Sequence, residues 1–220
     1  MRSDHPLATV LREAAHGRFP TYDRAVEVLP ALDGLAAAVF GFTGHAIITT
    51  DLAAQEIFEH LPSDDPGAPM NPAFIAWLVE RLGARCYTPD LVLAAFRAEP
   101  EASVSLIERP DLLSHPRAVM AQVFRRGVCA YSDAEGDGLL TFGYGVCDRI
   151  EVSIEIDAAL RNRGLGRKLA YAARNLAPDG EPVWAEVSPG NAASLRAFLA
   201  AGYVPIGSEV SLLPGAVLKT

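Results

Sequence analysis

One short stretch of this chain restricts what it can fold into more than any other. Ile154-Glu155-Ile156 alternates apolar and polar residues as a half-buried strand does, and Asp157 ends the run. A short loop follows, and the pattern then predicts a helix that opens at Gly164-Leu165-Gly166. The first backbone N–H groups of a helix have no partner within it, so a strand that leads into such a helix is a natural place to bind an anion.

Basic side chains gather at this predicted helix start. The turn and first helical residues carry Arg161, Arg163, Arg167 and Lys168, in a chain whose formal net charge is −8. Gly164 and Gly166 add no Cβ that would keep an anion away from the backbone. Two common phosphate loops are excluded, because G-x-x-x-x-G-K-[ST] is absent and G-x-G-x-x-G is met only by the glycine pair. The stretch therefore predicts a pyrophosphate site of another type.

The spacing R-x-x-G-x-G, from Arg161 to Gly166, resembles the acetyl-CoA motif [RQ]-x-x-G-x-[GA] of the GNAT superfamily of acetyltransferases. A second motif follows in register: the strand that begins at Val183 leads into Val187 and Asn191, similar to the family's V-x-x-x-N-x-x-[AS]. The segment Phe198–Tyr203 resembles its helix ending [YF]-x-x-x-G-[FY]. The resemblance covers residues 120–213 and implies a mixed, mostly antiparallel sheet flanked by helices.

The resemblance also implies roles for named residues. It implies that backbone N–H groups of the turn hold the pyrophosphate, namely those of Arg163, Gly164, Leu165, Gly166, Arg167 and Lys168, with Arg161 beside them. Backbone groups of Ile154 and Ile156 would pair with the pantetheine amide as a neighbouring strand does. Asn191 and Ser194 would contact the pantetheine arm, and Asn191 is equally suited to cap a helix.

Two carboxylates are candidates for the base that deprotonates an amine before it attacks a thioester. Glu186 occupies the position that serves as base in some family members, and its strand alternation places it opposite Val183, Ala185 and Val187. Glu155 is the second candidate, because it alternates away from its isoleucine neighbours. The alternative interpretation for each is a solvent-exposed strand glutamate without a catalytic role.

The sequence departs from the family at one catalytic position. The residue seven positions after Asn191 is Phe198, where the family places a tyrosine acid, and phenylalanine has no proton to give. Three alternatives remain open: Tyr171, Tyr203 or solvent supplies the proton, the reaction runs without a dedicated acid, or the protein binds the cofactor without efficient catalysis.

The rest of the chain predicts a smaller α/β domain over residues 1–100, ahead of the acetyl-CoA-binding domain over residues 101–220. Helices are expected at 7–16, 53–61, 73–82, 164–176 and 192–201. Strands are expected at 35–42, 46–50, 91–96, 123–131, 139–146, 149–156, 182–187, 203–206 and 209–213. Residues 99–103 are expected to form the linker.

Composition narrows the function classes further. A net-acidic chain does not suit general binding of nucleic acid or anionic membranes, and no apolar run reaches the length of a membrane span. The three separated cysteines and the five histidines show no metal-binding spacing, and thiols of this kind suit a reducing cytoplasm.

The sequence thus predicts a cytoplasmic N-acetyltransferase without a metal, which uses acetyl-CoA and an unidentified amine acceptor. The alternatives are a non-catalytic acyl-CoA-binding protein and, for residues 1–100, a partner-binding or homodimer-forming role.

Overall fold

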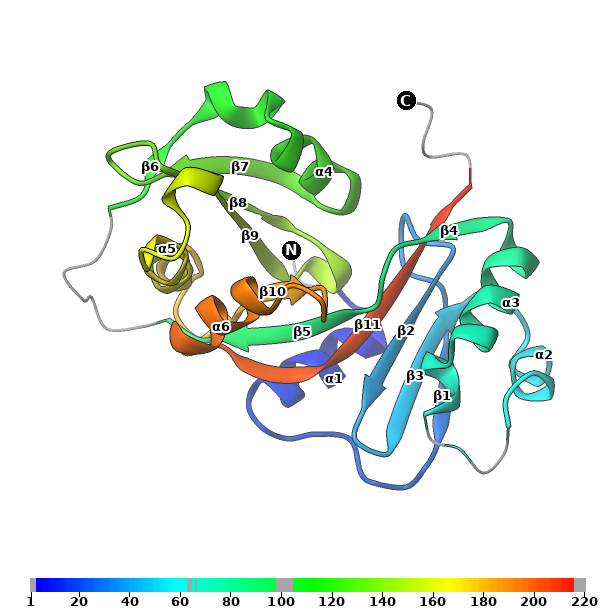
Figure 1. Ribbon diagram of the computed structural model, residues 1–220. Coiled ribbons are helices and arrows are strands. Elements are labelled where there is room, and N and C mark those ends of the chain that lie inside the picture. Colours follow the sequence, from blue (N-terminus) through cyan, green and yellow to red (C-terminus); the bar gives the residue numbers. More distant parts are fainter. Residues whose placement is uncertain (1–2, 63–64, 66, 98–104, 216–220) are drawn as a thin grey trace. The chain divides into compact units, whose positions relative to one another are not determined.

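The computed structural model describes residues 3–62, 65, 67–97 and 105–215 (Figure 1). By its internal contacts the chain divides into two compact units. Unit 1 comprises Val92–Pro205, and unit 2 comprises Asp4–Leu91 with the C-terminal segment that begins at Ile206. The chain crosses between the units within two strands, β5 (Asp90–Ala95) and β11 (Val204–Pro214). The boundary expected near residue 100 and the expected linker at 99–103 lie outside the described residues.

Unit 1 contains every candidate site residue. Its strands follow the order β5-β10-β9-β8-β7-β6. The elements are β6 (Ile107–Glu108), α4 (Pro116–Phe124), β7 (Arg126–Ser132), β8 (Gly138–Tyr144), β9 (Ile150–Ile156), α5 (Leu165–Ala173), β10 (Val183–Val187) and α6 (Ala192–Ala200). The pairs from β6 to β9 are antiparallel, whereas β9 and β10 run parallel.

The two faces of the unit 1 sheet differ in chemistry. On one face Leu140, Val152 and Ala185 are buried in a core completed by α5 and α6, including Leu169 and Phe198. The residues that alternate with them point to the opposite face, which α4 partly covers (Figure 1). This second face carries the polar side chains of β8, β9 and β10.

Unit 2 has strands and a core of its own. Its strands follow the order β1-β3-β2-β11, and β4 pairs with β11. The elements are α1 (Pro6–Ala15), β1 (Val26–Leu29), β2 (Ala37–Phe42), β3 (His45–Thr50), α2 (Ala54–Glu59), α3 (Pro72–Leu82) and β4 (Ala84–Cys86). Side chains of α2 and α3, among them Ile57, Phe74 and Leu78, are buried against Val39 and Ile48 of the sheet.

Local sequence explains several boundaries. Asn71 caps α3 by accepting a hydrogen bond from the Ala73 N–H at 2.9 Å, and Gly83 ends it in the left-handed region at φ +57°. The β2–β3 hairpin turns at Gly44, whose φ is +68°. A Cβ on Gly44 would lie 2.3 Å from the ring of Tyr22, so glycine is required there for two reasons.

The predicted fold class is confirmed: the protein is mixed α/β, with mostly antiparallel strands flanked by helices. Three expectations need correction. The segment predicted as a strand from Val123 begins at Arg126, because Val123 and Phe124 end α4. The strands expected at 203–206 and 209–213 are one strand, β11. Among the strands and α-helices of the described residues, β1, β4, β6 and α4 were not predicted.

Candidate functional site

The turn after β9 is built by its own polar contacts. Asp157 caps a short 3₁₀ turn, η4 (Ala158–Leu160), by accepting from the Ala159 N–H at 2.8 Å. The chain then doubles back, and the Arg161 Nε donates to the Ile156 carbonyl at 3.1 Å. Asn162 and Gly164 both adopt positive φ, at +62° and +81°. The backbone is thereby set to enter α5 at Leu165.

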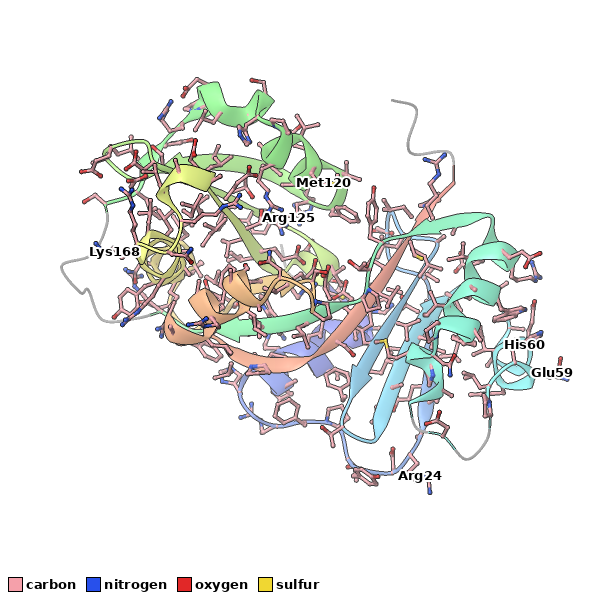
Figure 2. The ribbon with its side chains drawn as sticks, viewed as in Figure 1. Arg24, Glu59, His60, Met120, Arg125 and Lys168 are labelled. Carbon is pink, nitrogen blue, oxygen red and sulfur yellow. The ribbon has the colours of Figure 1, made fainter. Side chains whose placement is uncertain are left out.

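The start of α5 presents free donors and positive charge together. Gly164 occupies the cap position and has no side chain to cap with, and the first intrahelical bond runs from the Lys168 N–H to the Gly164 carbonyl. The three preceding N–H groups, of residues 165–167, therefore have no acceptor within the helix. Arg161, Arg163, Arg167 and Lys168 are all exposed, and Lys168 is labelled in Figure 2. The arrangement suits an anionic ligand.

The two glycines of the turn are needed for different reasons. Gly164 adopts a left-handed conformation that other residues avoid. Gly166 is ordinary helix, and a Cβ there would meet Ala197 and Ile156 only at 3.7 and 3.8 Å, which is normal contact. The packing of the protein itself does not demand a glycine at position 166.

The strands on either side of the turn separate. In the described residues β9 and β10 pair only at their first positions, Val183 with Ile150 and Trp184 with Glu151. The later part of β9, through Ile156, is paired with β8 alone. Its other backbone edge is left unpaired by the sheet.

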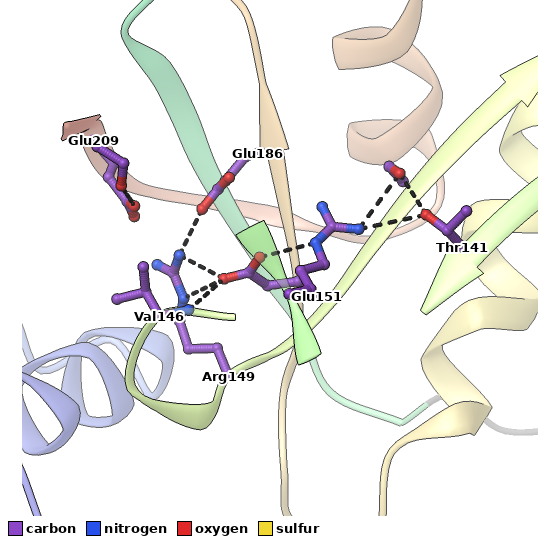
Figure 3. A network of polar contacts seen from close by, with 9 residues as sticks. Thr141, Val146, Arg149, Glu151, Glu186 and Glu209 are labelled. Carbon is purple, nitrogen blue, oxygen red and sulfur yellow. Dashed lines mark hydrogen bonds and ion pairs between the residues drawn. The ribbon is translucent and has the colours of Figure 1, made fainter. Parts of the chain in front are cut away.

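Glu186 belongs to an ion-pair network on the polar face. Its Oε1 accepts from Nη2 of Arg149 at 2.6 Å (Figure 3). Arg149 is itself buried, at 5% exposure, and also donates from Nε and Nη2 to Oε1 of Glu151 at 3.1 and 2.8 Å. The guanidinium lies 5.3 Å from the centre of the Trp184 ring. Glu186 is thus held by a buried arginine and is not an isolated strand carboxylate.

Glu151 is the centre of this network. It is 2% exposed, and its Oε2 accepts from the Arg125 Nε at 3.0 Å while its Oε1 also accepts from the Val146 N–H at 3.1 Å. Arg125 reaches further to the hydroxyls of Thr141 and Ser153, each at 3.4 Å (Figure 3). These charged groups balance in pairs, as burial of charge requires.

Two glycines of β8 and its following loop make room for the network. A Cβ on Gly143 would lie 3.0 Å from the Arg125 Cβ, and one on Gly145 would lie 2.2 Å from the Glu151 carboxylate. The prediction of site residues missed Arg125, Arg149 and Glu151. The strand alternation that singled out Glu155 also places Glu151 on the same face, so that signal was present in the sequence.

Glu155 lies on the polar face too, as predicted from its alternation. Its Oε2 is 3.4 Å from the Nε of Arg117 on α4, and both side chains are more than one third exposed. It is therefore a partly solvated ion pair, in contrast to the buried pair of Glu151 and Arg149.

Asn191 performs the capping role that the sequence suggested. Its side-chain oxygen accepts from the Ser194 N–H at 3.1 Å at the start of α6. Asn191 is exposed and Ser194 is half-buried. The contact fixes the first turn of α6 and leaves the Ser194 hydroxyl outside it.

The tyrosines considered as proton donors lie in different surroundings. Phe198 is buried at 3% exposure, and its ring meets that of Tyr203 edge to face at 4.9 Å. Tyr203 is 2% exposed, and burial raises the pKa of its phenol well above the ordinary value. A phenol with a raised pKa gives up its proton less readily and is a poor acid. Tyr171 is half-buried beneath the guanidinium of Arg174.

Other site types find no support in the described residues. No group of three or more His, Cys, Asp and Glu side chains among them could hold a metal ion. In the described part of the chain, Cys86, Cys129 and Cys147 take part in no disulfide. None of the helices in the described ranges combines the length and apolar character needed to cross a bilayer.

Comparison with known proteins gave structural likenesses only, since no family model and no curated protein matches the chain. A GCN5-related N-acetyltransferase from Kribbella flavida aligns at 20% identity and a TM-score of 0.41, over 66% of this chain and 64% of its own. A GCN5-related N-acetyltransferase-like protein from Streptococcus suis aligns at 13% identity and 0.44, over 81% and 83%. A GNAT-family acetyltransferase from Novosphingobium aromaticivorans aligns at 17% and 0.41, over 60% and 67%.

These three structures are named as GCN5-related or GNAT-family proteins, and at TM-scores below 0.5 they decide neither the fold nor the activity of this chain. The chain spans less than two thirds of the Kribbella protein. The aligned regions cover 60% to 81% of this chain, so the expectation that the likeness is confined to residues 120–213 is not confirmed.

Proposed function

We propose that this protein is an N-acyltransferase that moves an acetyl group from acetyl-CoA directly to an amine. The observation that carries the proposal is the start of α5. Unpaired backbone N–H groups and four exposed basic side chains lie together there, at the motif from Arg161 to Gly166. The pyrophosphate of coenzyme A would bind N–H groups of residues 163–167, while the Lys168 N–H, included in the expectation from the sequence, bonds the Gly164 carbonyl. Arg161, which already folds back onto β9, would lie beside the pyrophosphate.

The unpaired edge of β9 supports a second part of the cofactor site. Neighbouring pairs of an antiparallel ladder alternate between bonded and non-bonded, and the groups of a non-bonded pair point outward. Gly138, which faces Ile156 across the ladder, donates its N–H to Asp133 at 2.8 Å, and the Ile156 carbonyl accepts from Arg161. We infer that the backbone groups of Ile154 and Ile156 point away from β8. Ile154 and the Ile156 N–H would then be available to a pantetheine amide.

Glu186 is the proposed base. Its strand has left β9 by that position, and its carboxylate lies on the polar face. A protonated amine would lose one proton to Glu186 or to a water it holds, and the neutral nitrogen would attack the thioester carbon. The C–N bond forms, the C–S bond breaks, and the nitrogen releases its second proton. The thiolate of coenzyme A would take a proton from solvent, because Phe198 has none and Tyr203 is a poor acid.

Glu155 stays the second candidate base, and its exposed partner Arg117 makes it the more solvated of the two. Asn191 and Ser194 are proposed to contact the pantetheine arm from the start of α6. Arg125, Arg149 and Arg117 balance Glu151, Glu186 and Glu155 in ion pairs on this face. The net negative charge of the chain is therefore not concentrated at the proposed base.

Two variants of one position test cofactor binding. Gly166→Asp places a carboxylate in the first turn of α5, where its interaction with the helix dipole stabilises the fold by about 0.3–1 kcal/mol. The same carboxylate would repel a pyrophosphate. Gly166→Ala meets only normal contacts and fits the motif. Isothermal titration with acetyl-CoA should show binding in wild type and Gly166→Ala and at least tenfold weaker binding in Gly166→Asp. Equal binding by all three would remove the basis of the proposal.

A second candidate function is cofactor binding without efficient transfer, and buried Phe198 favours it. It predicts acetyl-CoA binding with no release of free coenzyme A thiol across a broad amine panel. Robust turnover that is abolished in Glu186→Gln would reject it. A cytoplasmic location, and a partner-binding or dimer-forming role for residues 1–100, stay proposals; light scattering on the full chain tests the dimer.

A further inference from the structure

Arg149 is the charged side chain that the proposed chemistry leaves unexplained. It lies just before β9 and is 5% exposed, which is rare for arginine. Its Nη2 contacts Glu186 at 2.6 Å and Glu151 at 2.8 Å, so one nitrogen joins the buried carboxylate to the proposed base. Trp184, two residues before Glu186 on β10, lies beneath the guanidinium at 5.3 Å.

The loop that delivers Arg149 is held in an unfavourable backbone conformation. Cys147 and Asp148, neither of them glycine, have consecutive positive φ values of +52° and +59°. Left-handed conformations at two successive ordinary residues persist only where the surroundings enforce them. The Val146 N–H bonds the Glu151 carboxylate, and the Gly145 N–H bonds the Arg149 carbonyl at 2.9 Å. The strain is thus tied to the contacts that place the guanidinium.

Glu151, which holds Arg149, is itself buried and held by further contacts. Its Oε2 accepts from Arg125, just before β7, and its carboxylate packs so closely on Gly145 that a Cβ there would lie 2.2 Å away. Within the described ranges, the network joins Glu186 to Arg149 and, through it, to Glu151, with Arg125 one contact further. The other ion pair of this face, Arg117 with Glu155, connects α4 to β9.

We propose that Arg149 is a positioning residue: it aims the carboxylate of Glu186 and keeps it ionised, through a guanidinium that Glu151 and Arg125 lock in place. The proposal rests on the function proposed above. An arginine beside a carboxylate favours its charged form, which a base needs before it can accept a proton. Two nitrogens of the guanidinium, Nε and Nη2, are held by Glu151, so the direction from which Nη2 meets the Glu186 carboxylate is fixed, which a lysine does less well.

The test compares pH–rate profiles of Arg149→Met, Arg149→Lys and Glu186→Gln with wild type. The matched control is Arg97→Met, which removes an exposed ion pair with Asp179 in the same unit. In Arg149→Met we expect the acid limb of kcat/KM to move up by about one pH unit or more. We also expect kcat to fall at least tenfold while the KM for acetyl-CoA stays within twofold. In Arg149→Lys the acid limb of kcat/KM should lie between those of wild type and Arg149→Met. Arg97→Met should have the same pH–rate profile as wild type.

A second readout does not depend on turnover. Carbon-13 NMR of the Glu186 carboxyl, assigned by its absence in Glu186→Gln, follows its titration directly in each folded variant. The midpoint should rise in Arg149→Met and lie between the two in Arg149→Lys. If Arg149→Met does not fold, the lysine variant alone decides: a titration midpoint and acid limb unchanged from wild type would overturn the proposal.

The outcomes separate the two proposals. If wild type acetylates no amine, the proposed function fails, while the NMR titration still decides whether Arg149 holds Glu186 ionised. If wild type is active and Arg149→Met loses stability with an unmoved acid limb and midpoint, Arg149 is only structural and the inference is wrong.

Discussion

Glu151→Gln is the most direct test of the buried network. The change keeps the size of the side chain and removes its charge. Glu151 is 2% exposed and accepts from Arg125 at 3.0 Å, from the Val146 N–H at 3.1 Å, and from two nitrogens of Arg149. A glutamine could keep some of these bonds through its oxygen, but its NH₂ group would face an arginine donor.

The expected loss follows from the charges that remain. With Glu151 neutral, the guanidinium groups of Arg125 and Arg149, at 8% and 3% side-chain exposure, would share only Glu186 as an acidic partner in the network. Breaking a buried pair in this way costs about 3–5 kcal/mol of unfolding free energy. For a chain of this size that corresponds to a fall in Tm of roughly 6–20 °C.

The assay can be confined to the right unit. The chain has two tryptophans, and Trp184 lies in unit 1 whereas Trp77 lies in unit 2. In a Trp77→Phe background, fluorescence during guanidinium unfolding therefore reports on the unit that contains Glu151. Arg97→Met in the same background removes an exposed ion pair and should change stability by no more than about 1 kcal/mol.

A specific result would refute the reasoning. If Glu151→Gln lowered the unfolding free energy by no more than the Arg97→Met control, the network would not be desolvated as its burial indicates. The claim that Arg149 is locked in place would then lose its physical basis.

Two further predictions concern other parts of the fold. Burial, with a smaller effect from the charge of Glu209, raises the pKa of Asp90 to about 6. The folded state therefore binds this proton more tightly than the unfolded state, so stability falls as pH rises from about 4 to 6. Asp90→Asn should raise the guanidinium midpoint at pH 7.5 and leave it unchanged at pH 4; an equal gain at both would be contrary to this. Gly202→Ala should cost about 1–3 kcal/mol in thermal unfolding, because φ is +85° and the new Cβ would lie 2.6 Å from Nη1 of Arg174; unchanged stability would mean that Arg174 moves freely.

Much of the secondary structure could be predicted because its causes are local. The strands within residues 37–50 are two short, mostly apolar runs that meet at Gly44, and α3 has a cap at Asn71 and a glycine stop. Helix α4, which was not predicted, begins at a His115 cap whose Nδ1 accepts from the Arg117 N–H at 3.2 Å. The same histidine–proline arrangement begins α1 at His5, so a repeated signal was available.

The error in β11 has a tertiary cause. Two strands were expected, at 203–206 and 209–213, with Gly207 and Ser208 between them. In the structure Ser208 pairs with Gly41 of β2, and a Cβ on Gly207 would lie 2.4 Å from the Gly41 carbonyl. The glycine permits close approach of a neighbouring strand, a requirement that the sequence alone does not reveal.

The sequence by itself determined the turn from Arg161 to Gly166, because its glycines, charges and strand–helix junction act over a few residues. It also determined the face on which Glu186 lies, through the period of a strand. Only the tertiary structure decided what Glu186 contacts. Arg149 reaches it across 37 positions of sequence, through the parallel pairing of β9 with β10 and a strained loop around Glu151. An ion pair depends on the register of separate elements, and no local pattern encodes that distance.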